Sequence, residues 1–128
     1  MTFGGGEPLM HADFLRAFIR LVNGRWRVRA ETSLHVPPEN AVLPLDEYIV
    51  DIKDMNPAIY HAYTGGNAAL ARENLAAVLR AGSADRVLAR VPLIPDYNTE
   101  GDVQKSVEAL RAMGVTRVDP FRYLRKDA

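Results

Sequence analysis

The sequence predicts an α/β fold, a fragment of a partial (β/α) TIM-type barrel with about five parallel strands and crossover helices. Two observations indicate this class. Segments whose apolar residues recur every three or four positions, as on one helix face, alternate with short strand-like runs. Glycine, proline and asparagine stand between these segments, where they favour turns and helix ends. Strands that alternate with helices form parallel sheets with right-handed crossovers, and about five strands are too few to close an eight-stranded barrel.

The first half of the chain contains one clear helix signal and three strand signals. Phe14 and Phe18 share one helix face, and Asn23-Gly24 favours the left-handed conformation that ends a helix. The residues from Trp26 onward alternate between apolar and polar, which predicts a strand with Trp26 on its apolar face. The expected elements are a strand at residues 1–3, a helix at 10–22, a strand at 26–32, a helical turn at 37–40 and a buried strand at 48–52.

The second half of the chain repeats the pattern of helix and strand twice. Asn67 and Thr99 can each cap a helix, because their side chains accept hydrogen bonds from the first free backbone N–H groups. Gly82 and Gly114 end these helices, and Pro95 stops the strand between them. The expected elements are a turn at residues 56–57, a helix at 68–81, a strand at 87–94, a helix at 100–113 and a closing strand at 115–121.

Composition bounds the class of protein. The chain has 128 residues, the size of one domain, and its 16 basic residues balance 16 acidic ones, so it lacks the basic excess of a nucleic-acid-binding protein. Its apolar runs are too short to span a bilayer, and its Gly-rich start lacks the apolar segment of a signal peptide, so we expect a cytoplasmic protein without membrane contact. Cysteine is absent, which excludes disulfides, thiolate metal sites and cysteine nucleophiles within these residues.

Polar residues gather where the predicted strands end. A Gly-rich turn at residues 4–8 follows the first strand, and Glu31 lies at the end of the second. Asp51 and Lys53 accompany the third strand, and Arg90 lies within the fourth. Because binding sites of parallel α/β proteins lie at the carboxyl ends of the strands, we expect a small-molecule site there. The turn lacks the Gly-Lys-Ser/Thr of a phosphate-binding loop and the spacing of a dinucleotide-binding one.

The same residues also have ordinary structural explanations. Glu31 lies on a polar strand face, where a solvated role is the common one. Asp51 and Lys53 are equally explained as an ion pair that satisfies a strand end. Arg90 stands inside an apolar strand and needs a carboxylate partner, for which Asp51 or Glu31 would serve with or without a ligand.

Four segments resemble one enzyme family. Residues 2–9, with Gly-Gly-Glu-Pro, resemble the corresponding segment of radical S-adenosylmethionine enzymes. Residues 50–56, with Asp-Ile-Lys, resemble the Asp-x-Lys segment of the activating enzymes for glycyl radical enzymes, the pyruvate formate-lyase activating enzyme type. Residues 63–75 and the Arg-Val-Pro-Leu-Ile-Pro stretch at 90–98 continue the resemblance in the family's order and spacing. Residues 1–128 are thus expected to form one truncated domain of this family.

The resemblance implies a partial barrel that binds S-adenosylmethionine across its strand ends. The backbone of the Gly-Gly-Glu-Pro segment would hold the amino group of the cofactor. An ammonium also suits carboxylate acceptors, and the cofactor's carboxylate suits a cation. The cofactor-binding residues that the resemblance assigns are Gly5, Gly6, Glu7, Glu31, Asp51, Lys53 and Arg90.

This chain departs from the family's pattern in ways that bear on activity. The family holds a four-iron four-sulfur cluster with a Cys-x3-Cys-x2-Cys loop upstream of Gly-Gly-Glu-Pro, and this chain has no cysteine. Leu34 stands where the family often has glycine, and Pro120-Phe121-Arg122 replaces Pro-Tyr-His. We therefore assign no catalytic or metal-binding residue and expect the chain to be inactive alone.

Two functions remain open at this stage. The chain is part of an activating enzyme that generates a glycyl radical on a partner enzyme, or it is a non-catalytic module that binds S-adenosylmethionine or pairs with another chain as a scaffold. The short strand at residues 1–3 would leave an unpaired sheet edge, which is prone to pair with a neighbouring chain. We therefore also expect self-association through this N-terminal edge.

Overall fold

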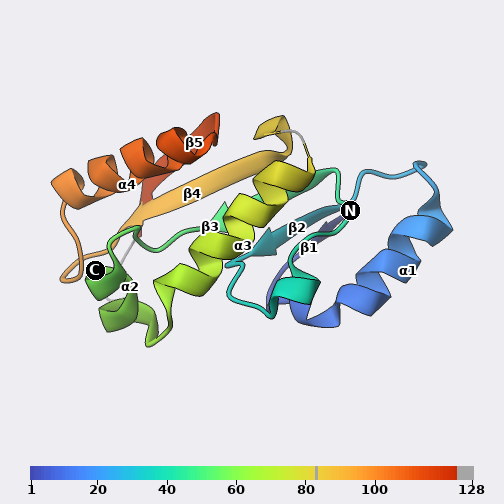
Figure 1. Cartoon of the computed structure of the whole chain (residues 1–128), viewed down its shortest axis with the longest axis horizontal. Coiled ribbons are helices and arrows are strands. Elements are labelled where there is room, and N and C mark those ends of the chain that lie inside the picture. Colours follow the sequence, from blue (N-terminus) through green and yellow to red (C-terminus); the bar gives the residue numbers. More distant parts are fainter. Residues whose placement is uncertain (83, 124–128) are drawn as a thin grey trace.

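A single parallel sheet of five strands forms the centre of the computed structural model, which describes residues 1–82 and 84–123. The strands lie side by side in chain order, and every neighbouring pair is parallel (Figure 1). The sheet is open rather than closed into a barrel, so the predicted fold class is confirmed. The strands are β1 Thr2–Phe3, β2 Arg29–Thr32, β3 Glu47–Asp51, β4 Val87–Leu93 and β5 Arg117–Arg122.

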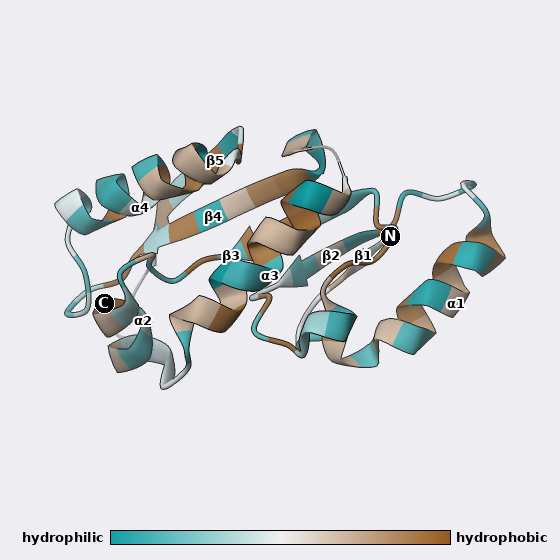
Figure 2. Cartoon of the chain, viewed as in Figure 1, coloured by the Kyte–Doolittle hydropathy of each residue, from teal (hydrophilic) through white to brown (hydrophobic). Residues whose placement is uncertain are grey.

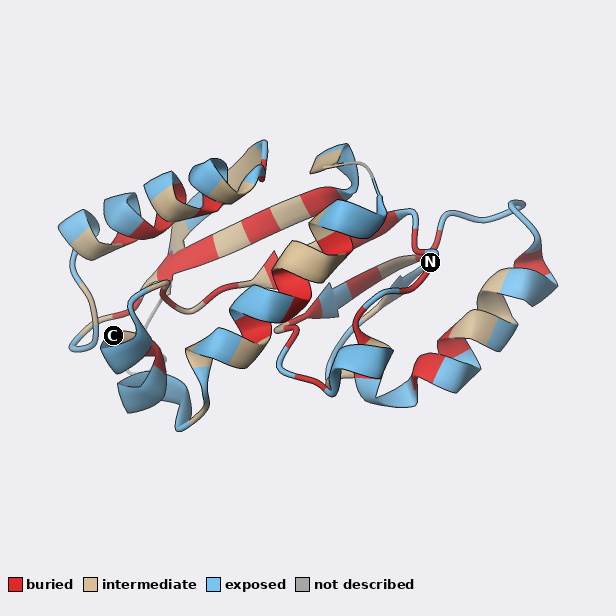
Figure 3. Ribbon diagram, viewed as in Figure 1, coloured by how far each residue is buried: buried red, intermediate tan, exposed pale blue. Residues whose placement is uncertain are grey.

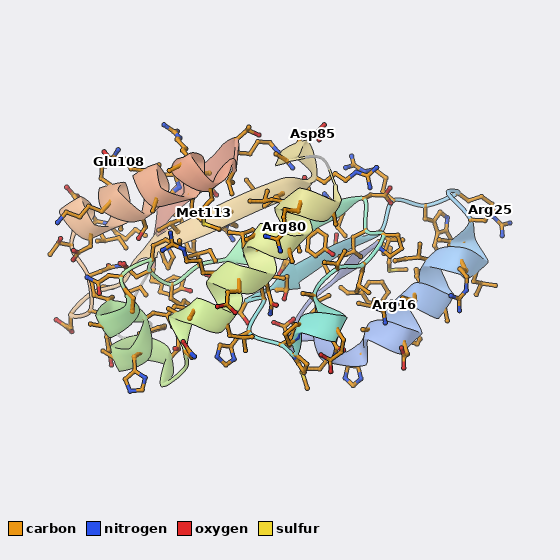
Figure 4. The ribbon with its side chains drawn as sticks, in the orientation of Figure 1. Arg16, Arg25, Arg80, Asp85, Glu108 and Met113 are labelled. Atoms are coloured by element: carbon orange, nitrogen blue, oxygen red, sulfur yellow. The ribbon has the colours of Figure 1, made fainter. Side chains whose placement is uncertain are left out.

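Four α-helices connect the strands. Figure 1 shows α1 at the β1 end of the molecule, α3 across the central strands and α4 beside β4 and β5. Short 3-10 turns at Pro8–His11, Pro38–Asn40 and Ala84–Arg86 complete the connections. The helices are α1 Ala12–Val22, α2 Pro57–Thr64, α3 Ala68–Ala81 and α4 Glu100–Met113. Arg16, labelled in Figure 4, ties α1 to the second of these turns by donating to the carbonyl of Glu39 at 2.9 Å.

The buried core lies between the sheet and its helices. Along β4, Val87, Ala89 and Val91 are buried and alternate with partly exposed residues, as the two-residue period of a strand requires (Figure 3). Figure 2 shows that the same strand is among the more apolar parts of the chain. Leu75 of α3 and Leu110 of α4 are completely buried in the same cluster. This packing holds the central strands in place and so fixes where their carboxyl ends lie.

The sheet register brings the polar strand ends together. Glu31 on β2 is aligned with Ile49 on β3, and Asp51 on β3 is aligned with Arg90 on β4. Because all strands run in the same direction, these residues and the turn after β1 meet at one edge of the sheet. The fold therefore brings the residues that the sequence singled out to one edge of the sheet.

Leu34, which replaces a glycine of the family pattern, adopts a left-handed backbone with φ 58°. This conformation strains a residue that carries a β-carbon. The surrounding structure holds it in place, because its N–H donates to the Thr32 hydroxyl at 3.0 Å and its carbonyl accepts from the buried Asn74 amide at 2.8 Å. The Leu34 side chain is itself completely buried, so packing offsets the strain.

Four expectations about the elements were wrong in detail. Helix α2 was expected only as a turn, but the Asn56 side chain accepts from the Ala58 N–H at 2.9 Å and starts a helix of eight residues. The second strand begins at Arg29 rather than at Trp26, whose side chain is 56% exposed. The first helix begins two residues later than expected, at Ala12, because a 3-10 turn precedes it and ends at His11. The last strand also begins two residues later than expected, at Arg117.

Candidate functional site

A cavity of about 360 Å³ opens at the carboxyl edge of the sheet. Its volume lies in the range of small-molecule sites. All seven residues that the sequence singled out line it, so their predicted proximity is confirmed, whereas their binding of a cofactor stays a prediction. The lining residues are Gly5, Gly6, Glu7, Glu31, Thr32, Ser33, Ile49, Asp51, Lys53 and Arg90.

The Gly-rich turn forms one wall of the cavity. Gly5 has φ 91°, a conformation that glycine adopts without strain, and open space surrounds the positions where Gly5 and Gly6 would carry side chains. The turn is fixed by the Glu7 carboxylate, which accepts from the hydroxyls of Thr32 at 2.7 Å and Ser33 at 2.8 Å. Backbone N–H groups of Ser33 and Leu9 also donate to it. The Glu7 side chain is thus occupied within the protein, and the turn offers its backbone to a ligand.

Glu31 is the carboxylate of the cavity that remains available. Within residues 1–82 and 84–123 its side chain has no hydrogen bond or ion pair, and it is exposed. One carboxylate oxygen lies 3.0 Å from the position that a β-carbon on Gly4 would take, so any larger residue at position 4 would displace it. Glu31 and Gly4 therefore fit each other at the cavity wall.

Lys53 is held by two partners on the far side of the cavity. Its ammonium donates to Asp51 Oδ2 at 2.6 Å and to the hydroxyl of Tyr123. Asp51 Oδ2 also accepts a longer contact from the Tyr123 hydroxyl at 3.5 Å. The other Asp51 oxygen, Oδ1, is buried and has no hydrogen-bond partner among the residues that the structure describes. The rings of Tyr123 and Tyr63 lie 5.0 Å and 5.9 Å from the ammonium, within range of cation–π attraction.

Sequence reasoning missed Tyr123 and Tyr63. Tyr123 directly follows the last strand and so reaches the same edge as the other strand ends. Its place shortly after a predicted strand was the sequence feature that could have identified it. Tyr63 lies on α2, the helix that was expected only as a turn, and although it opens the resembling segment at residues 63–75 it was not assigned to the site.

These contacts shift the pKa values of the Lys53 ammonium and of the Tyr123 phenol, which together form the Lys53 group. Burial alone would lower the pKa of the Lys53 ammonium, but its hydrogen bonds to Asp51 and Tyr123 outweigh burial, and the net pKa is raised. Burial raises the pKa of Tyr123 despite the opposing hydrogen bond from Lys53. At neutral pH the group therefore consists of a charged ammonium beside a protonated phenol.

The sequence indicated Asp51 or Glu31 as the partner of Arg90, but Arg90 pairs with neither of them. Its Nε lies 3.2 Å from Asp119 Oδ2, and its guanidinium stacks over the ring of Phe121 at 4.1 Å from the centroid. The reason is the register of β4 and β5, which aligns Arg90 directly with Asp119 as a cross-strand neighbour. The side chain is also 42% exposed, so it is not the buried arginine that its apolar neighbours indicated.

The charge distribution defines what the cavity can bind. Both of its cations are matched, Lys53 by Asp51 and Arg90 by Asp119. Glu31 is an unmatched anion, and Asp51 Oδ1 is a buried acceptor that has no donor within the described residues. The unsatisfied groups are therefore acceptors, which suit a ligand that carries a cationic centre and hydroxyl or ammonium donors.

The chain is similar in sequence to several curated enzymes, although no protein-family model matches it. It is 34% identical to the isethionate sulfite-lyase activating enzyme of Desulfovibrio desulfuricans, with 86% of this chain and 36% of that enzyme covered. It is 32% identical to the indoleacetate decarboxylase activating enzyme of Tractidigestivibacter scatoligenes, with 80% and 33% covered. It is also 32% identical to the (2S)-3-sulfopropanediol sulfolyase activating enzyme of Bilophila wadsworthia, with 96% and 41% covered.

A solved structure has the same fold. It is a domain of pyruvate-formate lyase-activating enzyme from Bacteroides vulgatus, which superimposes with a TM-score of 0.61 at 18% identity. The superposition covers 94% of this chain and 97% of that domain, so the two have nearly the same extent. At this identity the likeness concerns the fold.

The open α/β fold is that of a solved activating-enzyme domain, and the curated relatives show that the sequence resembles the radical S-adenosylmethionine family. Within it, the resemblance to the activating enzymes of glycyl radical enzymes is confirmed by the curated relatives. The chain spans about a third to two fifths of the length of these relatives.

Two features bear on membrane contact and on the iron–sulfur cluster: the helices of the described part and the cysteine content of the sequence. Among the helices in the described part of the chain, none combines the length and apolar character that crossing a bilayer demands. The family's cluster is held by cysteine thiolates, and the 128 residues contain no cysteine. The residues present do not fit that cluster.

Proposed function

We propose that this chain is the S-adenosylmethionine-binding part of an activating enzyme for a glycyl radical enzyme. The cavity at the carboxyl edge of the sheet carries the proposal, because it gathers the residues that the family resemblance assigns to the cofactor. Its unsatisfied groups are acceptors. S-adenosylmethionine carries an ammonium, a sulfonium and two ribose hydroxyls, and these groups complement such a cavity.

Different residues of the cavity would contact different groups of the cofactor. The ammonium would lie between the backbone of Gly5-Gly6 and the Glu31 carboxylate, since both are open to the cavity. Lys53 would offer the cofactor's oxygen atoms the one ammonium hydrogen that Asp51 and Tyr123 leave unused.

Radical chemistry needs a group that these residues do not hold. A reduced iron–sulfur cluster supplies the electron that cleaves S-adenosylmethionine, and the thiolates for it must come from outside residues 1–128. We therefore propose that this chain acts on a glycyl radical enzyme only together with the part that supplies the cluster. Alone, this chain binds the cofactor without cleaving it.

Calorimetric titration of the purified chain with S-adenosylmethionine and S-adenosylhomocysteine tests the proposal. We expect both to bind, and the sulfonium compound to bind more tightly because Glu31 is an unmatched anion. Glu31→Gln should weaken binding of S-adenosylmethionine by roughly tenfold, the loss of about 1.4 kcal/mol expected for one charge-assisted contact. Glu39→Gln, at an exposed position away from the cavity, is the control. Absence of binding at millimolar concentrations would contradict the proposal.

The second candidate function, pairing with another chain, is favoured by an aromatic surface at the β1 end. Phe14 and Trp26 are more than half exposed, and Phe18 lies 5.3 Å from Phe3 and 6.3 Å from Trp26, between ring centroids. A cavity of about 500 Å³ opens beside Phe3 and Phe14. Exposed apolar surface of this kind marks interaction sites in soluble proteins.

We propose self-association through this surface and the free edge of β1. Light scattering of the 14.2 kDa chain should give a mass above that of the monomer at micromolar concentration. Trp26→Ser should lower that mass toward the monomer, whereas Tyr97→Ser, which removes an exposed aromatic ring from the loop between β4 and α4, should leave it unchanged. A monomeric parent chain with a concentration-independent melting temperature would contradict self-association.

A further inference from the structure

Tyr123 occupies a position that joins the last strand to the candidate site. Its backbone N–H donates to the Leu93 carbonyl at 3.1 Å, which continues the pairing of β4 and β5 by one residue. Its ring lies edge-on to Phe121, with centroids 5.3 Å apart. These two contacts fix the ring over the carboxyl edge of the sheet, and the hydroxyl extends from it to Lys53 and Asp51.

The Lys53 ammonium is confined by the groups around it. Its side chain is only 22% exposed, and it contacts the Asp51 carboxylate, the Tyr123 hydroxyl and the two rings of Tyr123 and Tyr63. An ammonium has three hydrogens, and two of them are used by Asp51 and Tyr123. With two bonds fixed, the direction of the third hydrogen is also fixed, and Lys53 lines the cavity.

We propose that Tyr123 is a positioning residue, whose hydroxyl locks the Lys53 ammonium so that its third hydrogen faces an oxygen acceptor of a ligand bound in the cavity. The locking follows from the contacts of this chain alone. Naming that ligand as S-adenosylmethionine rests on the proposed function. Tyr123 lies outside the four segments that carry the family resemblance, and its role is inferred from its contacts alone.

Removal of the hydroxyl alone separates locking from packing. Tyr123→Phe keeps the ring against Phe121 and over the ammonium but removes the acceptor for Lys53. Tyr97→Phe is the matched control, because Tyr97 packs on Tyr63 at 4.8 Å and its hydroxyl is not a partner of Lys53. Circular dichroism and thermal melting establish that both variants keep the fold.

The first measurement follows the lysine ammonium groups directly in the free protein. The sequence contains three lysines, so their ¹⁵Nζ signals can be assigned with Lys53→Arg, and the exposed Lys105 serves as the internal reference. We expect the Lys53 ammonium protons to exchange slowly with water in the parent chain. Tyr123→Phe should accelerate this exchange at least about threefold, as loss of one hydrogen bond implies, with Tyr97→Phe unchanged. Unchanged exchange in Tyr123→Phe would overturn the locking role.

The second measurement tests the direction of the third hydrogen. Titration with S-adenosylhomocysteine, which has the same ribose and carboxylate oxygens as the cofactor, should give a Kd about three- to tenfold higher for Tyr123→Phe than for the parent. An unchanged Kd together with accelerated exchange would show that the lock does not serve this ligand and would overturn the positioning role. Failure of the parent to bind would refute the proposed function, while the exchange measurement would still decide whether Tyr123 locks Lys53.

Discussion

Glu7 and Ser33 are joined by two hydrogen bonds that cross from the turn after β1 to the loop after β2. The Ser33 N–H lies 3.0 Å and its hydroxyl 2.8 Å from the same oxygen, Glu7 Oε1. Thr32 occupies the other oxygen at 2.7 Å. The glutamate of the Gly-Gly-Glu-Pro segment is therefore a structural tie between two neighbouring strand ends, and it gives the cavity one of its walls.

Glu7→Gln should destabilise the chain because an amide cannot accept from all the donors that the carboxylate satisfies. We expect the free energy of unfolding to fall by about 1–3 kcal/mol, the cost of leaving partly buried donors unpaired. Urea denaturation measures the change, with Glu39→Gln as an exposed control. A loss equal to that of the control would show that the tie contributes nothing to stability.

Leu34→Gly sets the strain of a left-handed backbone against the burial of a side chain. Glycine relieves roughly 1–2 kcal/mol of strain at φ 58°, whereas loss of a completely buried leucine costs about 2–5 kcal/mol. The variant should therefore be less stable than the parent by urea denaturation. Leu34→Ala, which keeps the strain and loses the packing, should be at least as unstable. A glycine variant as stable as the parent would show that relief of the strain offsets the whole loss of packing.

Alkaline pH should destabilise the chain through Tyr48. Burial raises the pKa of this phenol above its ordinary value of 10.0, and its hydroxyl is held by the Leu43 N–H and the Ala41 carbonyl. A group whose pKa is raised on folding stabilises the fold below its unfolded pKa and loses this effect as pH rises through the folded pKa. Unfolding free energy should therefore decline above about pH 10.

Tyrosinate absorbance and urea denaturation between pH 7 and pH 12 check this prediction. Tyr48→Phe should be less stable at neutral pH, because the Leu43 N–H loses its acceptor, and its stability should depend less on pH above pH 10 than that of the parent. Equal slopes for parent and variant would assign the alkaline transition to other groups.

Anaerobic reconstitution with iron and sulfide should not give a stoichiometric cluster on this chain. The reason is the absence of cysteine from all 128 residues. Iron analysis after gel filtration and a 5′-deoxyadenosine assay with S-adenosylmethionine and a strong reductant make the measurement. One cluster per chain together with 5′-deoxyadenosine formation would refute the prediction.

The sequence predicted elements best where a cap marked each end. Helices α3 and α4 have the expected bounds, because Asn67 and Thr99 begin them and glycines follow their last residues. Helix α2 was missed because Asn56-Pro57 favours both a turn and a helix start, and only the fold decides between them. Trp26 alternates correctly but lies outside the sheet, since alternation does not show where a neighbouring strand ends.

The candidate site was predictable in its location but not in its pairings. Parallel strands bring their ends to one edge, so the approach of Glu31, Asp51 and Lys53 followed from the order of elements. The partner of Arg90 depends on the register between β4 and β5, which no residue pattern specified, and so Asp119 was not foreseen.

A sheet whose spatial order repeats the chain order can grow without rearrangement. Each strand of this protein pairs only with its predecessor and its successor, so β1 and β5 are both the outermost strands and the first and last along the chain. A further strand and helix joined to either terminus can continue the sheet by the same right-handed step, with no loop threaded through existing structure. The architecture is therefore modular, and further units can be added at either end while the five strands and their edge cavity stay intact.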